Sequence, residues 1–137
     1  MQPTTVEDWI EIANNRAADA EAIRKVEETS VGSVYMAGYA IECSLKALLR
    51  SQNTPFPKSG REGHNLKGLW DSCGFKLSDI KDPTGAQTFF IDNWNTSLRY
   101  QSTCGSHLKV PELLKGSQKL TGWIQTQIRR NNYGKKK

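Results

Sequence analysis

The segment from Val31 to Arg50 constrains the fold more than any other part of the chain. Its apolar residues recur at helical spacing, and as far as Ala40 they cover most of the circumference of a helix. The main stripe consists of Val34, Gly38, Ile41, Leu45 and Leu48, widened by Tyr35, Met36, Ala37, Ala40 and Leu49. A helix that is apolar on so much of its surface must be surrounded by other helices. The segment is therefore predicted to be the central helix of an α-helical bundle.

Helical patterns also lie on both sides of the central segment. Thr5 and Asp8 have the spacing of a capping box, and the pattern after them predicts a helix from about Thr5 to about Glu28. Residues 51–63 contain two prolines and two glycines and are predicted to form a loop. A short helix should follow, with Asn65 or His64 as its cap and Gly74 at its end.

Two more helices are expected in the second half of the chain. Asp82 and Pro83 have the pattern of an N-cap followed by a proline at the first helical position, and that helix should end near Tyr100. A last helix should open near Pro111. We therefore predict an all-α fold, an up-and-down antiparallel bundle of four long helices plus one short helix. It should form a single domain over residues 1–131, followed by a basic flexible tail over residues 132–137.

The chain length, cysteines and hydropathy limit the class of protein. A chain of 137 residues fits one domain. Cys43, Cys73 and Cys104 are odd in number and widely spaced, which suits free thiols better than a disulfide framework or a metal site. No membrane-spanning stretch and no signal peptide is visible, so we expect a cytoplasmic protein without a membrane partner.

The positive charge is concentrated at the carboxyl end. The net charge is +5, and residues 109–137 carry eight basic side chains and one acidic one. Such an end can contact phosphates, although a solvated tail has the same composition. Phosphate-binding loops, a nucleophile elbow and a His-Glu-x-x-His helix are all absent from the sequence, so most common enzyme classes lose support. No cofactor and no metal is expected.

Residues 37–49 (Ala-Gly-Tyr-Ala-Ile-Glu-Cys-Ser-Leu-Lys-Ala-Leu-Leu) closely resemble the second-helix signature of HEPN domains. An opening helix with Trp9, the Gly63-His64-Asn65-Leu66 segment and Trp94-x-x-x-Leu98-Arg99-Tyr100 look like further pieces of the same family. The resemblance implies a helical bundle that commonly dimerises. It also implies a family that includes metal-independent ribonucleases of toxin–antitoxin, CRISPR-linked and anti-phage systems, and members with no demonstrated nuclease activity.

In active members of that family, the catalytic groups are an Arg and a His separated by four to six residues. Here the candidates are Arg99 and His107, with seven residues between them. Arg99 would grip phosphate oxygens, and His107 would take or donate a proton. RNA would be bound by Tyr100, Lys109, Arg129 and Arg130. In the structural alternative, Arg99 pairs with an acidic residue such as Glu42, His107 is an ordinary loop residue, and Tyr100 anchors the core.

Two other residues have mainly structural interpretations. His64 is expected to cap backbone amides or to pack against the bundle. Glu42 and Lys46 stand at i and i+4, and this pair would contribute about 0.2–0.5 kcal/mol if it were exposed.

The leading hypothesis is therefore an RNA-directed HEPN protein of a prokaryotic toxin–antitoxin or anti-phage module, acting as a homodimer and leaving 2′,3′-cyclic phosphate ends if it cleaves RNA. The longer spacing between Arg99 and His107 instead favours a second hypothesis, a non-catalytic interaction subunit that pairs with a nucleotidyltransferase or other effector protein. A third hypothesis, nucleotide binding at a basic cleft, depends only on the charge distribution.

Overall fold

The computed structural model describes residues 3–57 and 60–135. It contains α1 (Val6–Val26), α2 (Val31–Ser51), α3 (Gly60–Gly63), α4 (Leu66–Ser72), α5 (Ala86–Asn93) and α6 (Val110–Lys135), with short 3-10 helices η1 (Leu77–Asp79) and η2 (Thr96–Tyr100). No strand occurs in these residues, so the predicted all-α class is confirmed for the described part of the chain. None of the helices described is both long enough and apolar enough to cross a membrane.

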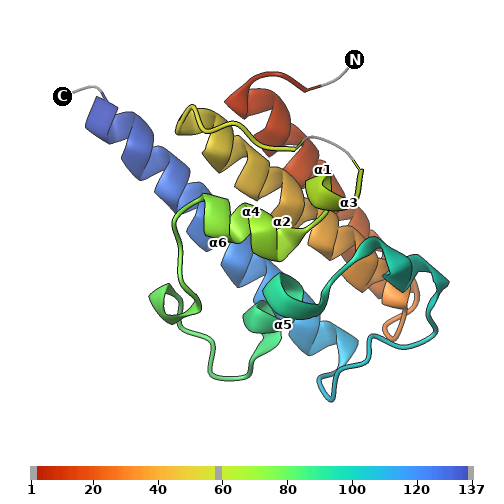
Figure 1. Ribbon diagram of the computed structural model, residues 1–137. Coiled ribbons are helices and arrows are strands. Elements are labelled where there is room, and N and C mark those ends of the chain that lie inside the picture. Colours follow the sequence, from red (N-terminus) through yellow and green to blue (C-terminus); the bar gives the residue numbers. More distant parts are fainter. Residues whose placement is uncertain (1–2, 58–59, 136–137) are drawn as a thin grey trace.

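Helix α2 is the centre of the molecule, as predicted. From Ala40 to Leu49 every residue is buried, and α1, α4, η2 and α6 all pack against this helix. Figure 1 shows α1 running antiparallel to α2, and α6 running in the same direction as α2.

The amino-terminal helix starts where the sequence predicted. The Thr5 side chain accepts a hydrogen bond from the Asp8 amide, and the Asp8 carboxylate accepts one from the Thr5 amide, so the capping box is formed. Helix α1 ends at Val26, two residues before the expected Glu28. At the other end of the chain, α6 continues to Lys135 and includes most of the expected tail, while Lys136 and Lys137 lie outside the described residues.

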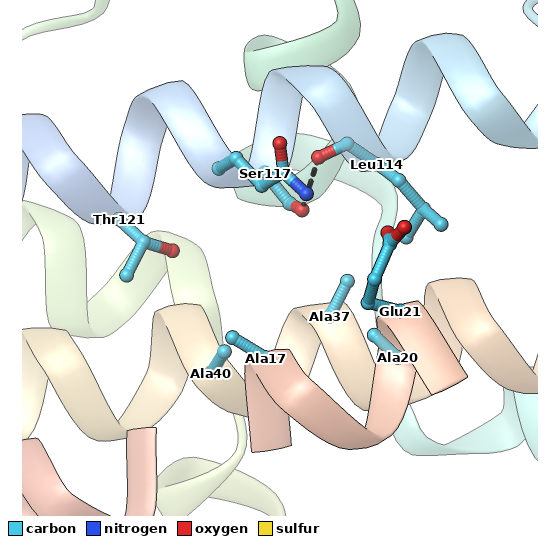
Figure 2. Close-up of a pocket in the computed structure, with 9 residues that line it drawn as sticks. Ala17, Ala20, Glu21, Ala37, Ala40, Leu114, Ser117 and Thr121 are labelled. Atoms are coloured by element: carbon cyan, nitrogen blue, oxygen red, sulfur yellow. Dashed lines mark hydrogen bonds between the residues drawn. The ribbon is translucent and has the colours of Figure 1, made fainter. Parts of the chain in front are cut away.

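Small side chains determine how closely the long helices approach. Ala17 and Ala20 on α1 and Ala37 and Ala40 on α2 face α6 around a cavity of about 150 Å³, as Figure 2 shows. On α6, the Ser117 hydroxyl is occupied within its own helix, where it donates to the Leu114 carbonyl. Methyl groups let α1 and α2 pack closely but do not fill the space beneath α6.

The long helix predicted from Asp82 to about Tyr100 is not formed as one element. Helix α5 has eight residues and begins at Ala86, because Gly85 at its N-cap has a left-handed backbone (φ 83°). The Asp82 carboxylate still caps this helix, since it accepts hydrogen bonds from the Gln87 and Thr88 amides. The prediction of Asp82 as the N-cap residue itself, with Pro83 at the first helical position, was therefore wrong.

The carboxyl end of α5 shows the second reason for its shortness. Trp94 leaves the helix with extended backbone angles (φ −69°, ψ 135°), and the Asn95 side chain then caps η2 by accepting a hydrogen bond from the Ser97 amide. Asparagine side chains compete with helical hydrogen bonds in this way. The segment expected as one helix therefore becomes α5, a corner at Trp94 and η2, and only α1, α2 and α6 are long among the described elements.

The short helix at residues 66–72 agrees with its prediction. Asn65 is the N-cap of α4, since its side-chain oxygen accepts from the Gly68 amide, and Gly74 adopts the expected positive φ of 86°. The preceding segment was predicted to be entirely loop, but its last four described residues form the single turn α3.

Candidate functional site

The structure brings Arg99 and Tyr100 together at the end of η2. Both side chains are exposed, and the Arg99 guanidinium carbon lies 4.9 Å from the centre of the Tyr100 ring. A hydrogen bond with Tyr35, followed in importance by one with Tyr100, raises the pKa of Arg99 further above its usual value. Arg99 is therefore a permanent, solvent-accessible cation next to the Tyr100 ring. Tyr100 is 77% exposed and does not anchor the core.

The side chain of His107 does not contact Arg99 through a hydrogen bond, ion pair or ring contact in the described residues. It lies exposed in the connection between η2 and α6, next to a local turn in which the Ser106 hydroxyl accepts from the Leu108 amide. Within the part of the chain that the structure describes, no hydrogen bond, ion pair or ring contact joins His107 to Arg99. The structural alternative for Arg99, an ion pair with Glu42, does not occur either, because Glu42 has other partners.

The predicted RNA-binding residues do not form one surface. Lys109 immediately precedes α6, whereas Arg129 and Arg130 are 20 residues further along it, which corresponds to about 30 Å of helix. The Arg129 guanidinium donates a hydrogen bond to the Thr126 hydroxyl on its own helix. Of the four predicted RNA-binding residues, Tyr100 is the one whose contact with Arg99 the structure shows.

A second group of chemically active side chains lies around Glu42 on α2, and sequence reasoning did not find it. The Glu42 carboxylate is buried, with Oε1 2.8 Å from Nδ1 of His64 and Oε2 3.0 Å from Nζ of Lys46. Lys46 is buried too and lies 5.2 Å from the centre of the Trp9 ring. The Glu42–Lys46 pair is therefore an interior ion pair, and the small energy expected of an exposed pair does not apply to it.

His64 packs against the bundle, one of the two roles expected of it, and Asn65 takes the capping role. Its imidazole is about one-third exposed, while the carboxylate that holds it is almost fully buried. The ring lies edge-to-face against Tyr39, with 5.7 Å between the ring centres. His64 is thus fixed on one side and open to solvent on the other.

Tyr35 and Tyr39, one turn apart on α2, connect this group with Arg99. Their hydroxyl oxygens are 2.9 Å apart, and both rings pack against Trp94. Burial, and then the hydrogen bond with Tyr35, raises the pKa of Tyr39 well above its usual value, so this phenol stays protonated at neutral pH. We call Tyr35 and Tyr39 the tyrosine pair; it contacts Arg99 through Tyr35 and His64 through Tyr39.

A cavity opens beside His64. It has a volume of about 390 Å³ and is lined by His64 and Asn65 on one side and by residues 94–97 on the other. Arg99 follows these lining residues in the same 3-10 helix. The lining combines the Trp94 ring with amide, hydroxyl and imidazole side chains, a mixture that is common in ligand sites.

The sequence contained a signal for this site. Tyr35, Tyr39 and Glu42 are spaced i, i+4 and i+7, so they share one face of α2. The histidine that completes the site lies 22 residues beyond Glu42, after a loop, and helical spacing gives no information about that contact.

The cysteines and the other acidic groups do not add to the site. Burial raises the pKa of Cys43 and of Cys73 to about 12 each, so neither is a thiolate at neutral pH. Among residues 3–57 and 60–135, no three His, Cys, Asp or Glu side chains are grouped in a way that could hold a metal ion.

Comparison with known proteins gives one match. The HEPN domain family matches residues 6–127, which extend from the first residue of α1 into the last third of α6. No curated protein and no solved structure shows significant similarity to the chain. The family match covers most of the sequence, including the tyrosine pair, Glu42, His64 and Arg99, and the chain belongs to the HEPN domain family.

Proposed function

We propose that this HEPN protein is an endoribonuclease that cleaves RNA without a metal ion and leaves 2′,3′-cyclic phosphate ends. The observation that carries the proposal is Arg99, an exposed guanidinium that lies 4.9 Å from the centre of the Tyr100 ring and follows, in η2, residues that line a cavity. RNA cleavage by the 2′-hydroxyl requires positive charge on the phosphoryl oxygens and a group that accepts a proton. Arg99 meets the first requirement, and His107 is the group that the sequence predicts for the second.

The exposed aromatic ring next to Arg99 supports a single-stranded substrate. Tyr100 offers a ring face on which an unpaired base can stack, and stacked bases are the usual mode of recognition for single-stranded RNA. Arg99 can hold the adjoining phosphate with two parallel hydrogen bonds. Lys109 can contact a neighbouring phosphate, whereas Arg129 and Arg130 would need an RNA that extends along α6.

The setting that we propose is a prokaryotic toxin–antitoxin or anti-phage module acting in the cytoplasm, with the protein as a homodimer. Two copies would bring two Arg99 side chains to one RNA strand. The support for this setting is family membership.

A second function is a non-catalytic subunit that binds a nucleotidyltransferase or another effector protein. The observation in its favour concerns the two residues expected to carry catalysis. Seven residues lie between Arg99 and His107, and no hydrogen bond, ion pair or ring contact joins the two side chains in the described chain. Under this hypothesis Arg99 serves binding or packing only.

The test is cleavage of a mixed RNA pool by purified protein in EDTA, with analysis of the product ends. We expect cyclic phosphate ends from the wild type and a loss of at least 100-fold for Arg99→Ala, since removing a charged group that stabilises a transition state costs about 10²–10³ in rate. Arg50→Ala is the matched control. Arg50 is also an exposed arginine, but it lies about 22 Å along α2 from Tyr35 and donates to the Thr4 carbonyl. Intact RNA with the wild type would favour the subunit hypothesis, and equal cleavage by Arg99→Ala would show that Arg99 is not part of the catalytic site.

A further inference from the structure

We propose that His64, held by the buried carboxylate of Glu42, is the general base of this site. The inference rests on the proposed ribonuclease function and names a catalytic residue for it. It also assigns Glu42 as a positioning residue that acts through His64. Sequence analysis gave the proton-transfer role to His107 and gave His64 only a structural one.

The hydrogen bond to Glu42 determines which nitrogen of His64 can act as a base. Nδ1 lies 2.8 Å from the Glu42 carboxylate, which can only accept a hydrogen bond, so Nδ1 carries the proton in the neutral ring. The lone pair is then on Nε2, at the opposite side of an imidazole that is about one-third exposed. A carboxylate behind an imidazole fixes the tautomer and the ring orientation and stabilises the imidazolium that forms.

Burial makes this arrangement rigid. Glu42 is only 3% exposed and its other oxygen is bound to Lys46, so the carboxylate cannot turn away from His64. Tyr39 packs edge-to-face against the imidazole and restricts its rotation. His107, in contrast, is exposed in a loop and has no recorded hydrogen bond or ring contact among the described residues.

The position of His64 relative to Arg99 is the third argument. His64 lines the cavity whose opposite side is residues 94–97, and Arg99 follows in the same 3-10 helix. Tyr39 contacts His64 and its hydroxyl is hydrogen-bonded with that of Tyr35, while both tyrosine rings pack on Trp94, two residues before the start of the 3-10 helix that carries Arg99. A phosphodiester held by Arg99 would therefore lie at the edge of the cavity that His64 lines.

The chemical step is a transesterification. Nε2 of His64 takes the proton from the ribose 2′-hydroxyl, the 2′-oxygen attacks phosphorus, and the bond between phosphorus and the 5′-oxygen breaks. Arg99 stabilises the negative charge on the non-bridging oxygens, and the departing 5′-oxygen takes a proton from water. The products are a 2′,3′-cyclic phosphate and a 5′-hydroxyl, and His64 releases its proton to solvent.

The experiment measures cleavage of RNA in EDTA by the full-length wild type and by His64→Ala, His64→Asn, Glu42→Gln and His107→Ala. We expect losses of about 10²–10⁴ for both His64 variants, because general base catalysis contributes that much. His64→Asn can still donate a hydrogen bond to Glu42 but cannot take a proton, so its loss does not report on folding alone. Glu42→Gln should lose about 10–100-fold, as expected when a group that orients a catalytic histidine is changed.

Imidazole rescue distinguishes a catalytic role from a structural one. Added imidazole can enter the cavity vacated in His64→Ala and accept the proton, so it should restore cleavage at least 10-fold. Added imidazole should not restore cleavage in Arg99→Ala. This variant therefore also measures how much RNA imidazole cleaves without the enzyme's site. A structural role for His64 would give no rescue, and the inference would then be wrong.

The results distinguish a failure of the role proposed for His64 from a failure of the proposed ribonuclease function. If His107→Ala is inactive while His64→Asn cleaves like the wild type, His64 is not the base, but the ribonuclease function stands. If the folded wild type cleaves no RNA at all, both the function and the role of His64 are wrong.

Discussion

Replacing Gly38 with alanine tests the contact that positions Trp94 beside the candidate site. A Cβ atom at residue 38 would lie 2.0 Å from Cε2 and 2.1 Å from Nε1 of Trp94, far closer than carbon atoms can approach. The indole is buried and its Nε1 has no hydrogen-bond partner among the described residues, so packing alone holds the ring. The Gly38→Ala substitution must therefore displace the Trp94 ring or separate α2 from the corner between α5 and η2.

Two opposing effects determine the magnitude. Overpacking a tight core costs up to about 3 kcal/mol. Alanine in place of glycine in a helix contributes about 1 kcal/mol of stability. The expected net loss is about 2 kcal/mol, which for a typical urea m-value of about 2 kcal/mol/M moves the unfolding midpoint down by about 1 M.

The assay is urea unfolding followed by far-ultraviolet circular dichroism, with Gly122→Ala as the matched control. Gly122 is also helical, in α6, but a Cβ there meets no atom within 4 Å, so the same substitution should raise stability by about 0.5–1 kcal/mol. If Gly38→Ala is as stable as Gly122→Ala, the close packing of Trp94 on α2 is not what holds this corner.

Three further predictions concern other parts of the fold. Gly116→Ala should lower the free energy of unfolding by about 1–2 kcal/mol in the same assay, because its Cβ would lie 2.5 Å from Cβ of Ala86 and 3.0 Å from the Ala86 backbone carbon; stability equal to the wild type would contradict this. With a thiol-specific disulfide reagent at pH 8, Cys104 should react first, and Cys43 and Cys73 only on unfolding, since burial raises the pKa of the latter two to about 12. Burial acts to raise the pKa of Asp82, but hydrogen bonds from Thr88 and from the Gln87 amide outweigh burial, and the net effect is a lowered pKa. The ionised carboxylate therefore stabilises the fold above about pH 4, and this contribution is lost as the pH falls below that value. Asp82→Ala should therefore cost about 1 kcal/mol at pH 7 and progressively less at lower pH; a difference that is independent of pH would show that the cap is not the cause.

The parts of the fold that were predicted correctly depend on local patterns. The apolar circumference of residues 31–50, the capping box at Thr5 and the positive φ at Gly74 each follow from a few neighbouring residues. The end of the helix expected from Asp82 to about Tyr100 does not follow from such a local pattern. The apolar residues Phe90, Trp94 and Leu98 continue a helical stripe through the corner, and all three are buried even though the helix stops at Asn93. Burial of these three residues explains why the apolar spacing stays helical, while the Asn95 cap ends the continuous helical backbone. The apolar pattern alone cannot distinguish one long helix from two short helices joined by a corner.

The candidate site could be predicted only in part for a related reason. Arg99 was predicted from a sequence motif. The contact between Glu42 on α2 and His64, just before α4, is a tertiary contact that no local pattern predicts. The interruption of the predicted helix also bears on that site. The corner at Trp94 places residues 94–97 opposite His64 and so forms the cavity, whereas an unbroken helix from 86 to 100 would have continued past it. Close packing of Trp94 over Gly38, which fixes this corner, is thus a structural requirement of the proposed site. Consequently, Gly38→Ala should reduce any RNA cleavage as well as stability, while Gly122→Ala should leave cleavage unchanged.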